Sequence, residues 1–435
     1  MSPTFHSLGI RNYRIYASGG LVSNIGTWMG RVAQDWLVLT VLTDHSATAL
    51  GTVTGLQFLP FLLLAPWAGM LVDRYSKRRL LVGTQTALLL TALALALLTA
   101  YGAVQLWHVY ALALLQGVAT ALDNPARQTF VSEMVDRDHL PNAVALNSAS
   151  FNLGRVIGPA VAGLVIARLG LAPALFVNAA SFLFVLAALA RMDATRLTPA
   201  PRARGKGQIR QGLRYVKGRP DIVLILFLVF VLGTFGMNFQ LTMALMATTV
   251  FDKGPGEYGA LGSIMAVGSL TAALLSARRA RPRLRVLLLA LAGFTVSTAV
   301  LSLAPSYVLF AVLLVPTGLA ALTALTTANA MVQVSVEPVM RGRVMALYMA
   351  IFMGGAPLGS PLIGWVGDAF GARWTIAIGT IMVGLSLGLV ALWFARHDNV
   401  RVSLTLRRRP RVRLSLAGEE RALFSDVRLE REAST

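Results

Sequence analysis

Residues 69–79 read GMLVDRYSKRR and decide the fold. This short, charge-dense stretch separates two apolar runs, at about residues 50–72 and 80–101. Each run is long enough to cross a bilayer, since a transmembrane helix needs about 20 predominantly apolar residues. Lys and Arg concentrate on the cytoplasmic side of membrane segments. The stretch therefore predicts two membrane helices that are joined by a cytoplasmic loop.

The composition of the whole chain agrees with a membrane protein. Of its 435 residues, 56% are hydrophobic and 13% are charged, and the mean hydropathy is +0.66. A soluble domain carries about 25% charged residues, so a soluble globular protein is excluded. The net charge of +20 would suggest nucleic acid on a soluble surface, but here the cations are confined to a few loops and the C-terminal tail. We expect no nucleic-acid partner. Since the chain has no cysteine, disulfides and thiolate metal sites are excluded.

The apolar segments predict an all-α integral membrane protein of twelve transmembrane helices. The first segment carries Arg31 and Asp35, so we expect it to remain as the first helix and not to be a cleaved signal. The predicted spans are 14–42, 47–72, 79–101, 106–131, 141–169, 171–191, 220–250, 256–277, 285–304, 306–333, 340–369 and 372–396.

The distribution of cations predicts the orientation in the membrane. The loop 192–219 holds eight Lys or Arg against one Asp, the loop 278–285 holds five, and the tail from His397 holds nine. The opposite side carries only Arg168, Lys253 and Arg373. This asymmetry places both termini in the cytoplasm. We expect a multi-pass protein of the plasma (inner) membrane.

Small residues recur between the two halves of the chain at a constant offset of 201. Gly117, Gly154, Gly158, Gly163 and Gly170 recur at Gly318, Gly355, Gly359, Gly364 and Gly371, and the pair at 145–146 recurs at 346–347. Such self-similarity predicts two pseudo-symmetric six-helix bundles. The expected parts are an N-terminal bundle 1–191, a basic linker 192–219, a C-terminal bundle 220–396 and a basic tail 397–435.

The opening stretch resembles the loop 2–3 signature of the major facilitator superfamily, Gly-x-Leu-x-Asp-Arg-x-Gly-Arg-Lys. Ser76 stands where the signature has its second Gly. The second-half copy has Ala277 at the position of Asp73, so we expect the first-half loop to be the gating element. In that role Asp73 is expected to bind the N-terminus of the span 340–369. The residues of this predicted gating loop are Gly69, Asp73, Arg74, Lys77 and Arg78, with Arg127.

A glycine pattern in the span 141–169 resembles the Gly-x3-Gly-Pro-x3-Gly motif of the drug/proton antiporter branch of this superfamily. Glycines at this spacing form a smooth groove for close helix contact, although ordinary small-residue packing gives the same spacing. We expect Gly158 and Gly163 to pack against the span 256–277 near Gly262, Met265 and Ser269. The groove residues are Gly154, Arg155, Gly158, Pro159 and Gly163.

Two further stretches, 28–36 and 123–159, resemble the enterobactin-exporter-like subgroup of this branch. The resemblance implies the major facilitator fold and export of a small molecule. It identifies no substrate.

The energy source is inferred by elimination. The chain has no Gly-x4-Gly-Lys-Ser/Thr loop for ATP, and its five histidines fall in tails, loops or span ends. Only Asp35 and Asp123 are carboxylates well inside predicted spans. A charge in a span costs from about 2.5 to more than 10 kcal/mol unless it faces water or a partner. Arg31 lies four residues before Asp35 on the same helix face. Two interpretations remain open: a structural ion pair, and a proton-coupling site.

Asp123 and Arg127 repeat this spacing in the span 106–131. Arg127 is alternatively a brace for Asp73 or Glu133. The superfamily's usual Arg three residues before Gln116 is replaced by Ala113, which argues against a proton-coupling role for this span.

Polar side chains inside the spans predict the substrate cavity. They follow one stripe in the first span and one in the fourth, and the resemblance implies that the seventh and tenth spans line the opposite wall. Phe and Met side chains accompany them, which favours a bulky amphipathic solute, although such residues also serve in packing. The expected cavity residues are Asn24, Trp28, Gln116, Thr120, Asn238, Thr326 and Gln333.

These observations predict a secondary transporter that exports an amphipathic small molecule, such as a drug, secondary metabolite or siderophore, in exchange for protons. Its expected partners are that solute, protons and the lipid bilayer, and we expect a monomer with no cofactor, no metal and no enzymatic activity. One alternative is a uniporter or importer on the same fold. Another is a non-transporting membrane sensor or scaffold, whose basic tail binds anionic lipid or a partner.

Overall fold

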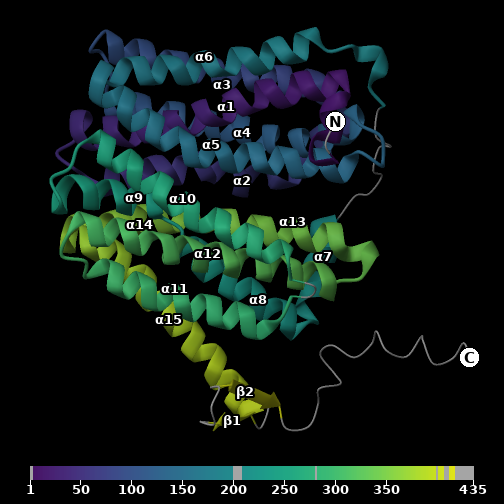
Figure 1. Ribbon diagram of the computed structural model, residues 1–435, viewed down its shortest axis with the longest axis vertical. Helices are drawn as coiled ribbons and strands as arrows, with labels where there is room; N and C mark the ends of the chain where they lie inside the picture. The colour runs from purple at the N-terminus through teal and green to yellow at the C-terminus, as the bar shows by residue number, and fades with distance from the viewer. Residues whose placement is uncertain (1–2, 199–207, 280–281, 398–399, 406–410, 417–435) are drawn as a thin grey trace, which may run out of the picture. The chain divides into compact units, whose positions relative to one another are not determined.

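The computed structural model describes residues 3–198, 208–279, 282–397, 400–405 and 411–416 (Figure 1). The chain divides into two compact units, residues 1–383 and 384–435, which are described separately. Residues 199–207 of the predicted linker and most of the predicted tail lie outside the described residues.

Six long helices form the first half of the larger unit. The first is continued by a π-helical turn, Val38–Leu42, and the second begins at Ser46, whose side chain accepts a hydrogen bond from the backbone N–H of Ala49. Such a cap satisfies one of the free N–H groups of a first helical turn. The helices are α1 (Arg11–Leu37), α2 (Ala47–Arg74), α3 (Lys77–Ala100), α4 (Leu106–Met134), α5 (Leu140–Leu169) and α6 (Leu171–Arg191).

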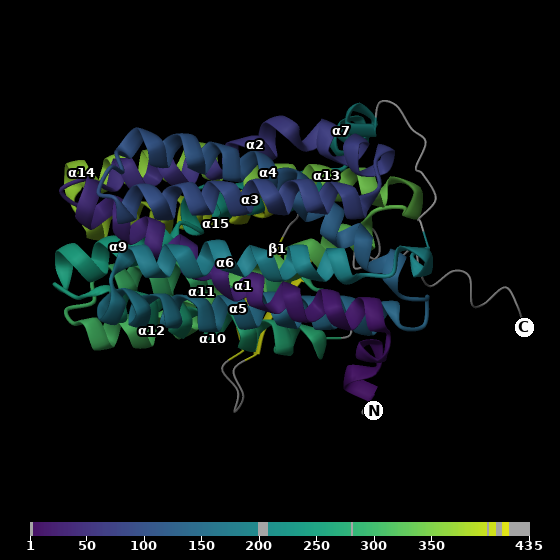
Figure 2. The same cartoon turned by 90° about the horizontal axis from the view of Figure 1, so that it is seen from above.

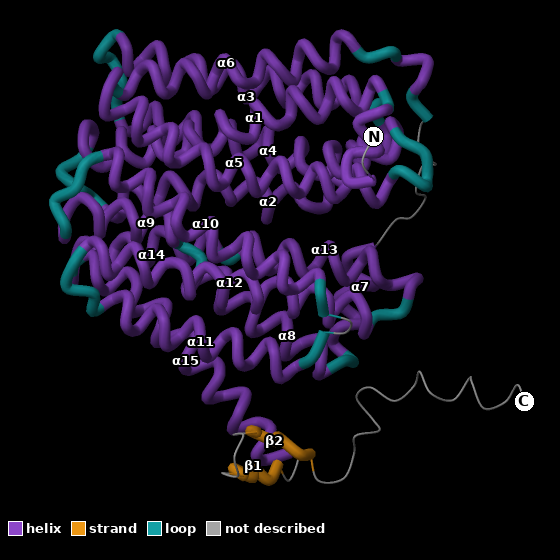
Figure 3. Tube along the Cα trace, in the orientation of Figure 1, coloured by secondary structure: helices purple, strands orange, loops and turns teal. Residues whose placement is uncertain are grey.

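The remaining elements begin in the linker and run to the tail. They are α7 (Gln208–Lys217), α8 (Pro220–Val231), α9 (Phe239–Leu245), α10 (Pro255–Ala277), α11 (Leu284–Ser302), α12 (Tyr307–Ser335), α13 (Pro338–Gly354), α14 (Ala356–Phe370), α15 (Ala372–His397), β1 (Val400–Thr405) and β2 (Arg411–Leu416). Figure 3 shows the predominance of helix along the trace.

The predicted spans coincide with these helices to within a few residues. In the described part of the chain, ten segments are long and apolar enough to cross a membrane, in place of the twelve predicted from the sequence. The other two predicted spans fall on α1 and α4. These helices have 27 and 29 residues, which at 1.5 Å per residue suffices for about 40 Å, but their polar side chains lower the hydropathy.

In its described residues the larger unit is all-helical, as predicted. In the tail, β1 and β2 form an antiparallel hairpin in which Val400 pairs with Leu416. The predicted linker contains α7. This helix packs against α13, where Gly212 lies against Arg343.

Two predicted spans are broken helices. The span 220–250 comprises α8, a π-helical turn at Leu232–Gly236, a non-helical step at Met237 and Asn238, and α9. The span 340–369 is divided into α13 and α14 at Gly355. Discontinuous helices of this kind are common at the sites of membrane transporters.

The offset of 201 predicted from the glycines is visible in the backbone. Gly170, between α5 and α6, and Gly371, between α14 and α15, adopt positive φ values of 91° and 98°. Only glycine adopts such values without strain. The repeat thus places equivalent left-handed turns in the two halves.

Helix packing brings the two halves of the larger unit together along two seams. Within the first half, α1 packs on α5 and α6, and α2 packs on α4; within the second, α12 packs on α10 and α11. Between the halves, α2 packs on α14 and α5 packs on α10 (Figure 2). A buried cluster around Tyr13, Phe130 and Leu189 forms part of the first-half core. Functional groups at the two seams can therefore join or separate the halves.

Candidate functional site

The helices of the larger unit share two ends. We call the end with the loop at 75–76, Arg278 and Arg283 the cationic end. The opposite end, with the loops at 43–46 and 251–254, is called the far end.

At the far end, Asp35 of α1 is bonded across the seam to Tyr258 of α10. The Tyr258 hydroxyl donates to Asp35 Oδ2 at 2.8 Å, and the two residues are only 7% and 2% exposed. The ring of Trp36 stacks on that of Tyr258, with centroids 6.3 Å apart and planes at 22°. Tyr258 was not predicted, because no sequence pattern relates it to a carboxylate 223 residues away.

The structure forms no ion pair between Arg31 and Asp35 in the part of the chain that it describes. The Arg31 guanidinium instead lies over the ring of Trp28, 4.9 Å from its centroid. Helical side chains lean toward the N-terminus, which brings Arg31 to the preceding turn while Asp35 is held by Tyr258. The two residues are therefore not in direct ion-pair contact in this structure, and their role remains a prediction.

Trp28 is also contacted by α5. The Arg155 guanidinium lies 5.8 Å from the Trp28 centroid, and Phe151 meets the same ring edge-on at 5.9 Å. One turn away, the Asn24 side-chain amide donates to Ser150 Oγ at 3.0 Å. We call Trp28, Arg31, Arg155 and Phe151 the Arg–Trp cluster. Trp28, Arg31 and Arg155 are partly buried and Phe151 is half exposed, and the cluster lies on the cationic-end side of Asp35.

A second bond across the seam at the far end uses Asp368, near the end of α14. Its carboxylate accepts from the backbone N–H groups of Ala47 (2.6 Å) and Thr48 (3.0 Å) and from Ser46 Oγ (3.1 Å). A carboxylate at a helix N-terminus is stabilised by the free N–H groups and the helix dipole. Asp368 was not predicted as a functional residue, because it stands at the end of a predicted span. The free backbone N–H groups of the first helical turn after Ser46 were the one feature of the sequence that could have indicated an anionic partner there.

Part of the glycine groove of α5 closes this end. A Cβ on Gly163 would overlap the carbonyl oxygen of Pro255, and one on Gly259 would overlap that of Pro159, so α5 and α10 touch through their backbones. Ser263 Oγ donates to the Val156 carbonyl at 2.6 Å in the same seam. The seam is thus packed too closely for side chains at these glycines.

The rest of the groove faces α1, and the expectation that Gly158 packs against α10 was wrong. A Cβ on Gly158 would lie 2.5 Å from Trp28 Cβ, and one on Gly154 would lie 2.9 Å from Asn24 Cβ. Met265 and Ser269 were also expected at this seam, but they lie against Gly318 of α12. Gly158 and Gly163, five residues apart, have different partners because α5 packs between α1 and α10.

The cations of the predicted gating loop bind within the first half. Lys77 is paired with Glu133 at 3.0 Å, and Arg78 Nε donates to the Leu189 carbonyl at 2.9 Å, at the end of α6. The Arg74 guanidinium lies 5.9 Å from the ring of Tyr75. Gly69 and Asp73 are in the last turns of α2, but their side chains lie outside the described residues, so the predicted contact of Asp73 remains a prediction.

Asp123 has a set of partners in the first half. It is 3% exposed, forms an ion pair with Arg127, and accepts from Thr84 Oγ1 at 2.6 Å and Gln85 Nε2 at 2.8 Å. A buried carboxylate with this many donors is well satisfied. Arg127 therefore braces Asp123, and this arrangement favours a structural role for the pair.

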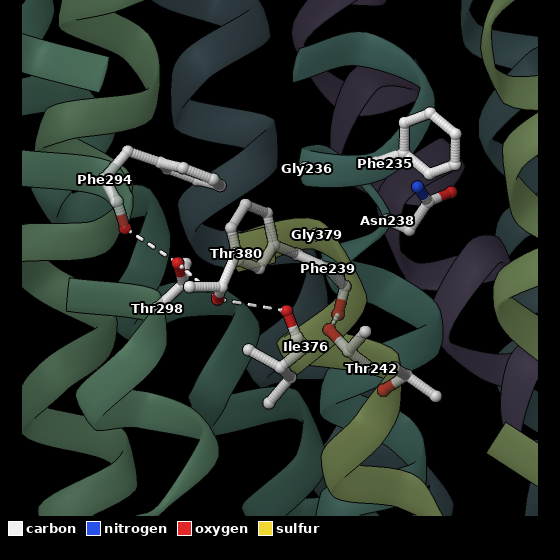
Figure 4. Close-up of a pocket in the computed structure, with 11 residues that line it drawn as sticks. Phe235, Gly236, Asn238, Phe239, Thr242, Phe294, Thr298, Ile376, Gly379 and Thr380 are labelled. Carbon is white, nitrogen blue, oxygen red and sulfur yellow. Dashed lines mark hydrogen bonds between the residues drawn. The ribbon is translucent and has the colours of Figure 1, made fainter. Parts of the chain in front are cut away.

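The expected cavity residues of the second half bind mainly within that half. Asn238 donates to the Thr234 carbonyl at 2.8 Å and accepts from Ser360 at 2.6 Å. It lines a pocket of about 10 Å³ between α9, α11 and α15, shown in Figure 4, which is the size of one water molecule and too small for a solute. Thr326 is hydrogen-bonded to Ser276 at 2.9 Å, and Gln333 is exposed.

In the first half, Gln116 and Thr120 are partly exposed on α4, where the Thr120 hydroxyl donates to the Gln116 carbonyl at 2.7 Å. Asn24 and Trp28 are the expected cavity residues that the structure brings together with Arg31 and Arg155.

Known proteins resemble this chain over nearly its whole length. The staphyloferrin A transporter of Staphylococcus aureus is 27% identical over 368 residues, covering 84% of this chain and 92% of that protein. The multidrug efflux pump Tap of Mycolicibacterium fortuitum is 28% identical over 394 residues, covering 86% and 94%. The enterobactin exporter of Shigella boydii is 26% identical over 380 residues, covering 84% and 88%.

Solved structures share the fold. An inward-facing, unoccupied bacterial homologue of the human lysosomal transporter Spinster matches with a TM-score of 0.68 and 14% identity, covering 90% of this chain and 97% of that one. A D-xylose–proton symporter matches with a TM-score of 0.69 and 14% identity, covering 87% and 96%. At this identity the likeness shows the major facilitator fold alone.

The family model described as transmembrane secretion effector matches residues 2–416. The relatives are transporters and not enzymes, and many of the segments described above are able to span a membrane. The chain is accordingly a multi-pass membrane transporter that belongs to the transmembrane secretion effector family of the major facilitator superfamily.

Proposed function

We propose that this chain exports an amphipathic small molecule in exchange for protons, by alternating access of two six-helix bundles. It would act as a monomer with twelve spans in the plasma (inner) membrane, with the cationic end and both termini in the cytoplasm. Relatives named for staphyloferrin A, enterobactin, macrolides and multidrug efflux support export of such solutes.

The hydrogen bonds between the two halves support an inward-open state of this cycle. Within the described residues, the side-chain hydrogen bonds that join 1–191 to 220–383 are those of Asp35, Asp368 and Ser263, all at the far end. At the cationic end, Arg74, Lys77 and Arg78 contact residues of their own half. On the proposed orientation, the external side is closed.

The hydrogen bond between Asp35 and Tyr258 is the main observation that supports the proposed proton coupling. Closing the far end takes Asp35 out of water, and burial penalises a carboxylate far more than a neutral acid. Protonation from outside would therefore favour closure. Release of that proton toward the cytoplasm would leave a buried carboxylate at Asp35, which Tyr258 stabilises only in part. The far end would then open again, this time with the solute bound, because opening returns the carboxylate to water. Binding of a proton and opening of the far end are then linked, as exchange requires.

The test uses purified protein in liposomes with an imposed pH gradient and a panel of siderophores and antibiotics. Asp35→Asn should abolish gradient-driven transport while passive exchange of the same solute persists. Asp44→Asn is the matched control, because Asp44 is an exposed carboxylate of a far-end loop. If Asp35→Asn pumps normally and Asp123→Asn does not, the coupling group is on α4. Normal pumping by both variants would refute proton exchange.

A further inference from the structure

The Arg–Trp cluster holds two cations that form no ion pair with any residue that the structure describes. Arg31 and Arg155 lie 4.9 and 5.8 Å from the centroid of one indole ring. Across the described ranges, neither guanidinium forms an ion pair or a hydrogen bond with the protein. The carboxylate nearest in sequence, Asp35, is already bonded to Tyr258.

Two unpaired guanidiniums close together are costly in a membrane protein. Each guanidinium carries five N–H donors in a planar fork, and a charge placed inside a membrane normally faces water or a partner. The two like charges also repel each other. The cation–π contacts to Trp28 offset only about 0.5–2 kcal/mol each. An arrangement of this kind is stabilised by a bound anion.

We infer that Arg31 and Arg155 bind the acidic group of the transported molecule, which is an amphipathic organic anion carrying a carboxylate beside an aromatic or apolar body. A guanidinium matches a carboxylate through two parallel N–H···O bonds. Phe151, which is 50% exposed, and the edge of Trp28 offer an apolar surface beside the two cations. Asn24 and Ser150 add polar groups one turn away.

The position of the cluster agrees with this role. It lies on α1 and α5, on the cationic-end side of the Asp35–Tyr258 bond. A solute that entered from the cationic end would therefore meet the two arginines before the closed far end. This inference rests on the proposed transport function, but it concerns binding and not proton coupling.

The test is an equilibrium binding experiment without a pH gradient, on the full chain in nanodiscs of neutral phosphatidylcholine. The probes are dansylglycine and dansylglycinamide, which differ in the presence of the carboxylate. The wild-type protein should bind dansylglycine at least about tenfold more tightly than the amide, since one charge-assisted contact contributes about 1.4 kcal/mol or more. Arg31→Gln and Arg155→Gln should each remove most of this preference, while binding of the amide is unchanged.

The controls separate charge from folding. Arg155→Lys keeps the charge and should retain part of the preference, and Arg168→Gln, an exposed cation on α5, should retain all of it. Unchanged amide binding shows that each Gln variant is folded. Equal binding of the two probes by the wild type would overturn the inference, and so would displacement of dansylglycine by phosphatidylglycerol, which would assign the site to lipid. A wild-type protein that prefers the carboxylate probe but shows no transport driven by a pH gradient would refute only the proposed proton coupling.

Discussion

Replacing Tyr258 by Phe removes one hydroxyl from the seam at the far end and leaves the packing of the ring in place. In the structure this hydroxyl donates to Asp35 at 2.8 Å, and the ring stacks on Trp36. Among the described residues it is the one hydrogen-bond donor to this carboxylate. The substitution would therefore leave a buried carboxylate without a donor whenever the far end is closed and Asp35 is ionised.

The expected size of the effect follows from the kind of hydrogen bond that is lost. A hydrogen bond to a charged group contributes about 1.5–3 kcal/mol, whereas one between neutral groups contributes about 1 kcal/mol. The closed far end should lose the larger amount when Asp35 is ionised and the smaller amount when it is protonated. Since 1.4 kcal/mol is a factor of ten, the open population should rise about 10- to 100-fold in mildly alkaline buffer and about fivefold in mildly acidic buffer.

Spin-label distances measure this shift. The chain has no cysteine, so labels on Asp44→Cys and Lys253→Cys report the separation of two exposed far-end loops, one from each half, without a background. Pulsed electron resonance in nanodiscs should show longer distances for Tyr258→Phe, and more so at alkaline pH. The Asp35→Asn variant should show no dependence on pH.

Tyr307→Phe is the matched control, because its hydroxyl donates to the Glu257 carbonyl at 2.9 Å at the same end but within one half. It should leave the distance distribution unchanged. Identical distributions for Tyr258→Phe and the wild type at both pH values would refute the argument that this bond holds the far end closed.

Three further variants test the described contacts. Gly259→Leu should prevent closure of the far end and abolish transport, because its Cβ would overlap the carbonyl oxygen of Pro159, whereas Gly256→Ala, which has open space around it, should remain active in the same transport assay. Asp123→Ala should lower the thermal unfolding midpoint strongly, because breaking a buried ion pair costs about 3–5 kcal/mol, and an unchanged midpoint would contradict its structural role. Asp368→Ala should open the far end only about two- to fivefold by spin-label distance, because an exposed carboxylate at a helix N-terminus contributes about 0.3–1 kcal/mol.

The sequence by itself determined the positions of the helices and the repeat. Apolar runs predict spans because the thickness of the bilayer sets the length of a transmembrane helix. Inside the bilayer, backbone N–H and C=O groups can form hydrogen bonds only within the helix, since no water is present. Of the twelve predicted spans, those at α1 and α4 are not among the ten helices apolar enough to cross a membrane, because polar residues interrupt them. The glycine offset predicted two related halves, and Gly170 and Gly371 adopt positive φ values at equivalent positions in them. All these features depend on local sequence.

The tertiary structure alone decided which side chains meet. Helical periodicity placed Arg31 and Asp35 on one face, but it could not show that Tyr258, 223 residues away, would take the carboxylate. Nor could the spacing of Gly158 and Gly163 show that they would contact different helices. Residues on one helix face are related by the pitch of that helix, whereas partners on different helices depend on how the helices cross. For that reason the candidate residues were found in the sequence, and their partners were found only in the fold.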